Sequence, residues 1–251
     1  MSQKKQKRNP NSPASKRARR EFLRATVAGV GVTGLAMAGW LPIAAQATPR
    51  LRPPGAIDEK EYLASCIKCG QCVQVCPVEA LVLADVDDGF GIGAPYLDAR
   101  AQACDFSCDA VQCVLACPTG ALSHDIDKKE QVTMALAKLT KPENCLARKG
   151  LGFKGKARGE DFEGLHRYLE VDRWNPIKVA DHEYDLEICD LCVRECPIKG
   201  AIELVPMGDG KGMTPVIKEA CVGCGMCEMM CPVEPTCIEM DVDAQAKAGA
   251  A

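Results

Sequence analysis

The sequence has few aromatic residues and few histidines. Trp, Tyr and Phe together make up 4% of the 251 residues, so we do not expect a large conventional core built on aromatic side chains. The three histidines, His124, His166 and His182, have no metal-ligand spacing to one another, and we expect each to be an ordinary surface residue. The sequence also lacks a nucleotide-binding motif and an acid–base constellation, which argues against an enzyme.

The chain beyond residue 47 is short of positive charge. Nine of the 31 Lys and Arg lie within residues 1–47, together with a single acid. This leaves 22 basic against 33 acidic residues in the rest of the chain, a net charge of −11. So acidic a body argues against a nucleic acid as partner. It is compatible with docking on a basic electron-transfer surface, although most acidic surfaces only aid solubility.

Cysteine, by contrast, is abundant, with 17 residues, and such an excess requires either disulfides or metal. The first group, residues 66–77, has the spacing C-x2-C-x2-C-x3-C-P, which bacterial ferredoxins use to hold a [4Fe-4S] cluster. Three thiolates on a tight loop take three corners of one cluster, and in two-cluster ferredoxins the fourth Cys ligates the other cluster. Zinc sites rarely combine three evenly spaced Cys with a Cys-Pro pair, so the spacing favours iron–sulfur over zinc.

The Cys-Pro turn occurs four times, and each copy closes one group of cysteines. The groups span residues 66–76, 104–117, 145–196 and 221–231, and the third is interrupted by an insert at 146–188. Disulfides are the rival interpretation, but repeated triplets that end in Cys-Pro do not resemble a disulfide framework. The candidate cluster ligands are Cys66, Cys69, Cys72, Cys76, Cys104, Cys108, Cys113, Cys117, Cys145, Cys189, Cys192, Cys196, Cys221, Cys224, Cys227 and Cys231.

Cys237 is left over. It aligns with Ala80, Ala121 and Ala201, the small apolar residues behind the other Cys-Pro turns, and we expect it to be a buried small hydrophobe.

Each copy of the repeat predicts a cluster loop, a short helical turn and a short strand, for instance over 80–84 and 201–205, with a second strand over 214–218. The Gly-rich run at 150–156 fits no P-loop spacing and is interpreted as a solvated basic loop.

These observations predict an α+β fold of small, loop-rich tandem modules, similar to bacterial 2[4Fe-4S] ferredoxins, in a body spanning residues 61–243. A flexible tail is expected at 244–251. Residues 48–60, rich in Pro, are expected to be a stiff, extended linker.

Residues 1–47 have the features of an export signal. Arg19, Arg20, Phe22 and Leu23 match the twin-arginine pattern, an apolar stretch covers 25–44, and Ala45 and Ala47 match the A-x-A cleavage pattern. The twin-arginine route carries folded proteins, as a protein loaded with clusters in the cytoplasm requires. We therefore expect a periplasmic protein, and an uncleaved signal acting as a membrane anchor stays open as the alternative.

The leader, the segment 51–57 (LRPPGAI), the first cysteine group, Cys145 and the last two groups together resemble the MauM/NapG family of ferredoxin-type proteins. The resemblance implies four [4Fe-4S] clusters and no catalysis. It further implies electron transfer from a membrane quinol-oxidising protein of the NapH type, through c-type cytochromes, toward periplasmic nitrate reductase. The MauM branch, linked to methylamine oxidation, shares the cluster plan, so the pathway stays open between the two, and a ferredoxin subunit of another periplasmic oxidoreductase is a further alternative.

Similar four-cluster subunits use crossed ligation, and the resemblance implies that the first group pairs with the fourth and the second with the third. One cluster would then take Cys66, Cys69, Cys72 and Cys231, its neighbour Cys221, Cys224, Cys227 and Cys76, a third Cys104, Cys108, Cys113 and Cys196, and the last Cys145, Cys189, Cys192 and Cys117. The alternative closes each group on its own four cysteines.

Overall fold

The computed structural model describes residues 20–35, 49–88, 91–108, 110–168, 170–172, 175–208, 210 and 212–243. The chain divides into two units, Met1–Thr48 and Pro49–Ala251. In the first unit, residues 20–35 form a helix whose side chains are all exposed. Within the described residues, no helix has the length and apolar character needed to cross a membrane.

Only some of the predicted signal residues lie within the part of the chain that the structure describes. Arg20, Phe22 and Leu23 lie on the exposed helix, whereas Arg19, Ala45 and Ala47 lie outside the described residues, as does the tail at 244–251. The twin-arginine signal and its cleavage therefore stay predictions.

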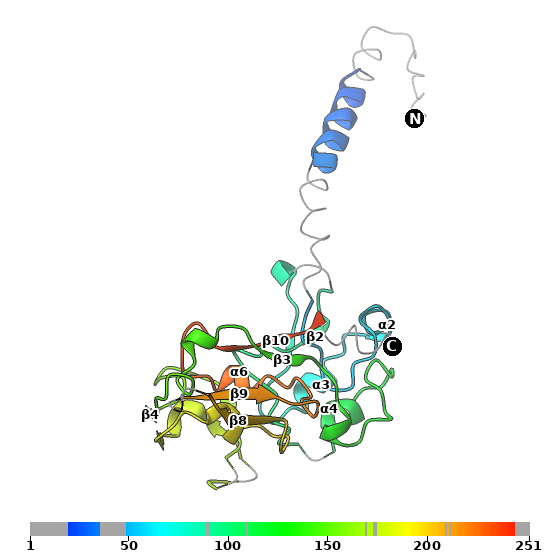
Figure 1. Cartoon of the computed structure of the whole chain (residues 1–251). Coiled ribbons are helices and arrows are strands. Elements are labelled where there is room, and N and C mark those ends of the chain that lie inside the picture. Colours follow the sequence, from blue (N-terminus) through cyan, green and yellow to red (C-terminus); the bar gives the residue numbers. More distant parts are fainter. Residues whose placement is uncertain are drawn as a thin grey trace, which may run out of the picture. The chain divides into compact units, whose positions relative to one another are not determined.

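The second unit contains short helices and short strands joined by long irregular segments (Figure 1). The α-helices are α2 (Glu59–Ser65), α3 (Gln71–Gln74), α4 (Gln112–Leu115), α5 (Leu191–Arg194) and α6 (Met226–Met229). The 3-10 helices are η1 (Val86–Asp88), η2 (Lys129–Gln131), η3 (Pro142–Asn144) and η4 (Val179–Asp181). The strands are β1 (Val82–Leu83), β2 (Pro95–Tyr96), β3 (Leu136–Leu139), β4 (Phe153–Gly155), β5 (Leu165–His166), β6 (Ile177–Lys178), β7 (Tyr184–Leu186), β8 (Ile202–Pro206), β9 (Met213–Ile217) and β10 (Ile238–Asp241).

Among the described residues, the strands form five antiparallel pairs: β1 with β2, β3 with β10, β4 with β7, β5 with β6, and β8 with β9. The β3–β10 pair joins the middle of the chain to its C-terminal part, with Leu139 opposite Ile238. The mixed helices and small sheets agree with the predicted α+β class. Strands β1, β8 and β9 lie within the predicted strands or within one residue of them.

The helices α3, α4, α5 and α6 are each four residues long, far too short to be stable alone. Each carries the third cysteine of its group at its second position. Gly70 and Gly225 precede α3 and α6 in the left-handed region, with φ of 73° and 87°. A Cβ on Gly225 would lie 2.6 Å from the Cβ of Ala99, so glycine is required there for both conformation and space.

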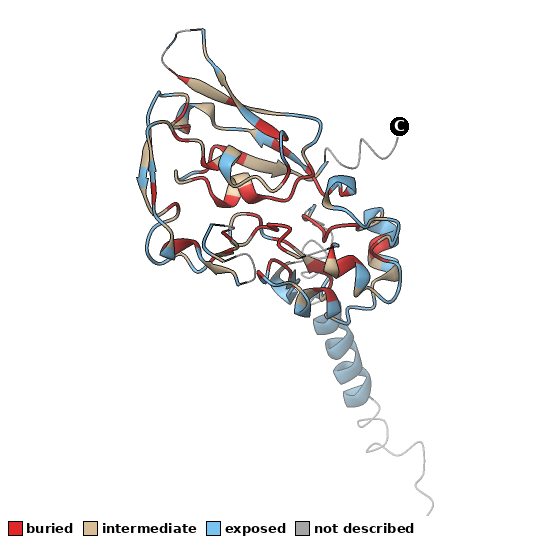
Figure 2. Ribbon diagram, turned by 90° about the horizontal axis from the view of Figure 1, so that it is seen from below, coloured by how far each residue is buried: buried red, intermediate tan, exposed pale blue. Residues whose placement is uncertain are grey.

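The buried residues of the second unit lie largely in irregular segments, and they are not gathered on the face of one large sheet (Figure 2). Its buried side chains are small aliphatic residues, cysteines and methionines, of which Met226, Met229 and Met230 are almost fully enclosed. Helix α3 contacts α4, and α5 contacts α6. Consecutive cysteine groups are therefore brought together in pairs.

The linker expected at 48–60 is instead largely part of the folded body. Residues 51–55 are buried, Leu51 forms a β-bridge with Leu97, and Ala56 forms one with Leu122. The Arg52 guanidinium makes two hydrogen bonds to the Glu59 carboxylate and donates a third to the carbonyl of Pro95 at 3.1 Å. These backbone and side-chain contacts turn a proline-rich, apparently extended sequence into core.

The insert at 146–188 is also more ordered than expected, because β4 pairs with β7 and β5 pairs with β6. The run at 150–156, expected to be a solvated loop, contributes the strand β4. The expectation of surface histidines is confirmed for His124, which is exposed. It is wrong for His166, which is buried at 6% exposure because two acidic side chains neutralise it.

Candidate iron–sulfur centres

The structure gathers the sixteen candidate cysteines around four cavities. Each cavity is lined by three cysteines of one group and the last cysteine of another. Cavity A is lined by Cys66, Cys69, Cys72 and Cys117; cavity B by Cys104, Cys108, Cys113 and Cys76; cavity C by Cys221, Cys224, Cys227 and Cys196; and cavity D by Cys145, Cys189, Cys192 and Cys231.

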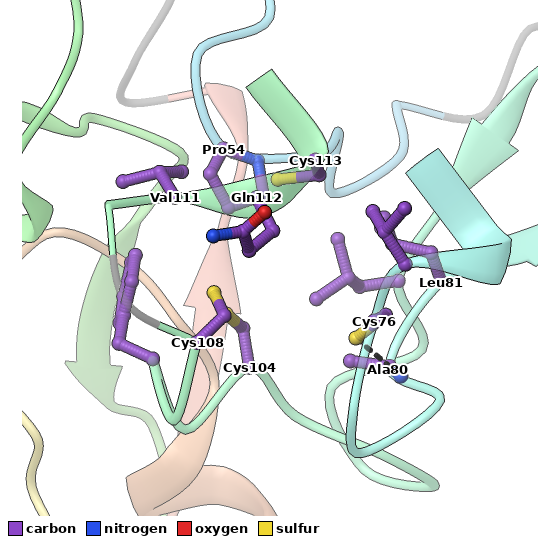
Figure 3. A pocket seen from close by; sticks show the side chains of 12 residues that line it. Pro54, Cys76, Ala80, Leu81, Cys104, Cys108, Val111, Gln112 and Cys113 are labelled. Carbon is purple, nitrogen blue, oxygen red and sulfur yellow. Dashed lines mark hydrogen bonds between the residues drawn. The ribbon is translucent and has the colours of Figure 1, made fainter. Parts of the chain in front are cut away.

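The four cavities are closely alike in size, with empty volumes of about 340 Å³ for A and B and about 350 Å³ for C and D. Figure 3 shows cavity B, where Cys76 arrives from the first cysteine group and faces Cys104, Cys108 and Cys113 of the second. The backbone N–H of Ala80 donates to the sulfur of Cys76 at 3.3 Å. Backbone donors of this kind are a common way to stabilise a ligating sulfur.

The arrangement corrects the pairing expected from the sequence. The cysteines line the cavities in a crossed arrangement, but the first group exchanges its last cysteine with the second, and the third with the fourth. Cys231 therefore lines cavity D rather than cavity A, and Cys117 lines cavity A rather than cavity D. The physical reason is the direct packing of α3 on α4 and of α5 on α6, which joins groups that are neighbours in the sequence.

The cavities suit a group larger than a single ion. Among the described residues, no three His, Cys, Asp or Glu side chains are placed so that they could hold one metal ion. Apart from the cysteines, the walls are mainly aliphatic, for instance Leu81 and Val111 in cavity B and Ile202 and Ile217 in cavity C. Four cysteines spread around an apolar cavity match the donor set of a [4Fe-4S] cluster.

Burial shifts the pKa values of several cysteines that line the cavities. Burial raises the pKa of Cys72 to about 11, of Cys189 to about 11 and of Cys224 to about 12. Left alone, these sulfurs would be neutral thiols at neutral pH. To ligate as thiolates they would need a compensating positive charge, which the iron of a cluster would supply.

The cavities follow one another in the order A, B, C, D. Burial raises the pKa of Cys113, and nearby thiols, including Cys72 of cavity A, raise it further. Cys104 of cavity B donates its backbone N–H to the carbonyl of Cys224 of cavity C at 3.1 Å. Burial also raises the pKa of Cys227, and Cys192 of cavity D adds to that effect.

A buried histidine joins the two inner cavities. His166 Nε2 lies 2.9 Å from the carboxylate of Glu195, and its Nδ1 lies 3.7 Å from that of Asp105. Asp105 directly follows Cys104 of cavity B, and Glu195 directly precedes Cys196 of cavity C. The hydroxyl of Tyr184 donates to the second oxygen of Glu195 at 3.0 Å.

Sequence reasoning missed this group because the contacts come from segments far apart in the chain. Tyr168 and His182 complete it: the two rings stack at a centroid distance of 4.0 Å, and Tyr168 meets the edge of His166 at 4.5 Å. The only signal in the sequence was the presence of two of the three histidines within the insert.

Cys237 is buried, as expected for a small apolar residue, at 3% exposure. It also lines cavity D, together with Cys145 and Cys231. Hydrogen bonding to Cys237 lowers the pKa of both of these cysteines, against the effect of burial.

The chain matches the family model of the 4Fe-4S dicluster domain over residues 65–121 and 188–234. It is 34% identical to ferredoxin-type protein NapG of Escherichia coli, over 88% of this chain and 84% of the relative. It is 34% identical to methylamine utilization ferredoxin-type protein MauM of Methylorubrum extorquens, over 88% and 86%, and 36% identical to MauM of Paracoccus denitrificans, over 85% and 82%. No solved structure matches the chain.

The two matched regions contain fifteen of the sixteen candidate cysteines. The remaining one, Cys145, lies between the two regions in the sequence, and the fold brings it to cavity D. The relatives are ferredoxin-type proteins, and the expectation of an electron-transfer subunit rather than an enzyme agrees with them. By its resemblance over nearly nine-tenths of its length, the chain belongs to the NapG/MauM family of ferredoxin-type proteins.

Proposed function

We propose that this protein relays electrons through four [4Fe-4S] clusters, one in each of the cavities A to D. The observation that carries the proposal is the fourfold recurrence of one apolar cavity lined by three cysteines of one group and the last cysteine of its neighbour. Cavities A and B would form one two-cluster module and C and D a second, each with the crossed ligation of bacterial ferredoxins.

When bound, such a cluster accepts and releases one electron at a time. The residues of the chain would hold it, exclude water and set its reduction potential. The thiolates would be the four ligands at each site, and aliphatic neighbours such as Leu81 and Ile202 would keep solvent away. Backbone donors such as the N–H of Ala80 would offset part of the negative charge on the sulfurs.

The cysteines of cavity A are more exposed to solvent than those of cavity D, at the other end of the row of cavities. In cavity A, Cys69 is exposed and Cys66 and Cys117 are half-buried, whereas in cavity D Cys145, Cys189 and Cys231 are all buried. Electron exchange with a partner requires a short distance from the partner's redox centre. Cavity A is therefore the end at which we propose that a partner docks.

For partners, we propose a membrane quinol-oxidising protein of the NapH type on one side, and c-type cytochromes or periplasmic nitrate reductase on the other. The support is the similarity to NapG. The similarity to MauM is equal in extent, and it favours a second candidate, electron transfer in methylamine oxidation. The leader supports export by the twin-arginine route to the periplasm, with or without removal of the signal.

Two measurements test the proposal. The purified protein is expected to contain about sixteen iron and sixteen acid-labile sulfide atoms per chain and to give EPR signals of reduced [4Fe-4S] clusters with dithionite. A colourless protein that contains zinc, or one with cystine bridges, would refute it. A pull-down from membranes then distinguishes the partners, since co-purification of a quinol-oxidising protein supports the NapH-type relay.

A further inference from the structure

The fourfold repeat places one equivalent residue in every cavity. It lies behind the Cys-Pro turn and is Ala121 in cavity A, Ala80 in cavity B, Ala201 in cavity C and Cys237 in cavity D. All four are buried, at 2 to 3% exposure. Three cavities therefore present a methyl group at this position, and cavity D presents a thiol.

The position of Cys237 is fixed by its backbone. Its carbonyl accepts hydrogen bonds from the N–H groups of Thr140 at 2.9 Å and Lys141 at 3.2 Å. The next residue, Ile238, begins β10 and pairs with Leu139. These contacts hold the Cys237 side chain against cavity D, where it shares the wall with Cys145 and Cys231.

A fifth cysteine has no corner to occupy on a cluster that already has four cysteine ligands. Cys145, Cys189, Cys192 and Cys231 fill these places in cavity D by the same geometry as in the other three cavities. Cys237 then keeps its proton, and the thiolates beside it can only accept a hydrogen bond.

We infer that Cys237 is a positioning residue of cavity D, whose S–H group donates a hydrogen bond to a ligating sulfur and makes that cluster easier to reduce. Reduction adds one electron and therefore negative charge, which spreads onto the ligating sulfurs. A donor stabilises the more negative state, so the potential rises. No bond to sulfur forms or breaks, and the proton stays on Cys237. The inference rests on the proposed function.

The decisive variant is Cys237→Ala, because it gives cavity D the methyl group that the other three cavities already have. We expect full iron and sulfide content, three unchanged reduction potentials and one lowered potential in an EPR-monitored redox titration. The loss of one hydrogen bond is expected to change the ratio of reduced to oxidised cluster by up to about tenfold, or about 59 mV for a one-electron couple.

Cys237→Ser keeps a donor of similar size and is expected to leave the potential close to that of the wild type. The Cys189→Ser variant identifies the EPR signal that belongs to cavity D, since that signal alone should change. As the reverse control, Ala201→Cys introduces a thiol at the equivalent position of cavity C, and the potential of that cluster should rise.

Three results would overturn the inference. Loss of about a quarter of the iron in Cys237→Ala would make Cys237 a ligand, and four unchanged potentials would make it a packing residue only. A serine variant with a potential as low as that of the alanine variant would also count against the hydrogen bond. Failure of the proposed function is distinguishable, because it shows in the iron and sulfide content of the wild type.

Discussion

Replacing His166 by Gln tests the contact between the two inner cavities. Burial disfavours the imidazolium, but interactions with Asp105 and Glu195 outweigh burial and raise the pKa of His166 from 6.5 to about 9. A difference of that size corresponds to about 3 kcal/mol of stabilisation of the folded protein. Since the folded pKa lies above the unfolded value, the stabilisation is fully present below pH 6.5 and is lost as the pH rises through about 9.

The assay is thermal bleaching of the cluster absorbance, because proteins of this kind unfold irreversibly and their stability is best followed as a rate or an apparent midpoint. At pH 6, His166→Gln should bleach at a clearly lower temperature than the wild type, and the difference should shrink toward zero between pH 9 and 10. His124→Gln is the matched control, since His124 is exposed. If the two proteins bleach at the same temperature at pH 6, or if the difference between their bleaching temperatures does not depend on pH, the buried cation does not stabilise the fold.

Three further predictions concern other parts of the structure. Cys69→Ser and Cys117→Ser should each remove about four of sixteen iron atoms and the same EPR signal, whereas loss of different signals would contradict the crossed pairing in cavity A. Arg52→Ala should destabilise the body by about 2 kcal/mol in thermal bleaching, because its hydrogen bonds to Glu59 are partly buried; an unchanged midpoint would contradict this. Gly223→Ala should lose the cluster of cavity C, seen as loss of its EPR signal, because a Cβ there meets the backbone of Ala135; Gly208→Ala has open space and should retain all the iron.

The cysteine groups and the short strands could be predicted because both are encoded locally. Spacing alone places three cysteines of one group on one loop, and the alternation of Gly-rich turns with apolar runs marks the hairpin of β8 and β9. The α+β class follows from the same local signals.

The pairing of the groups could not be derived in this way. The resemblance to four-cluster subunits implies pairing of the first group with the fourth, yet the fold pairs groups that are neighbours in the sequence. Joining neighbours closes a shorter loop and costs less chain entropy, a consideration that spacing does not express. Cys145 is the exception, and it reaches cavity D because the insert folds back through the pairing of β4 with β7.

The burial of residues 51–55 and of His166 was also beyond the reach of local patterns. Two consecutive prolines resemble an extended spacer, and only the β-bridge to Leu97 and the hydrogen bonds of Arg52 reveal a core segment. A lone histidine resembles a surface residue until Asp105 and Glu195, which lie far from it in the sequence, are seen beside it.

The division of the cysteines between two halves of the chain has a consequence for biogenesis. Every cysteine of cavities A and B has been synthesised once residue 117 is added, whereas cavity D also requires Cys231 and is followed by the strand β10. If each cavity holds a cluster as proposed, the nascent chain could fill cavities A and B before cavities C and D. The strand β10, which pairs with β3, would be the last strand that the second unit needs.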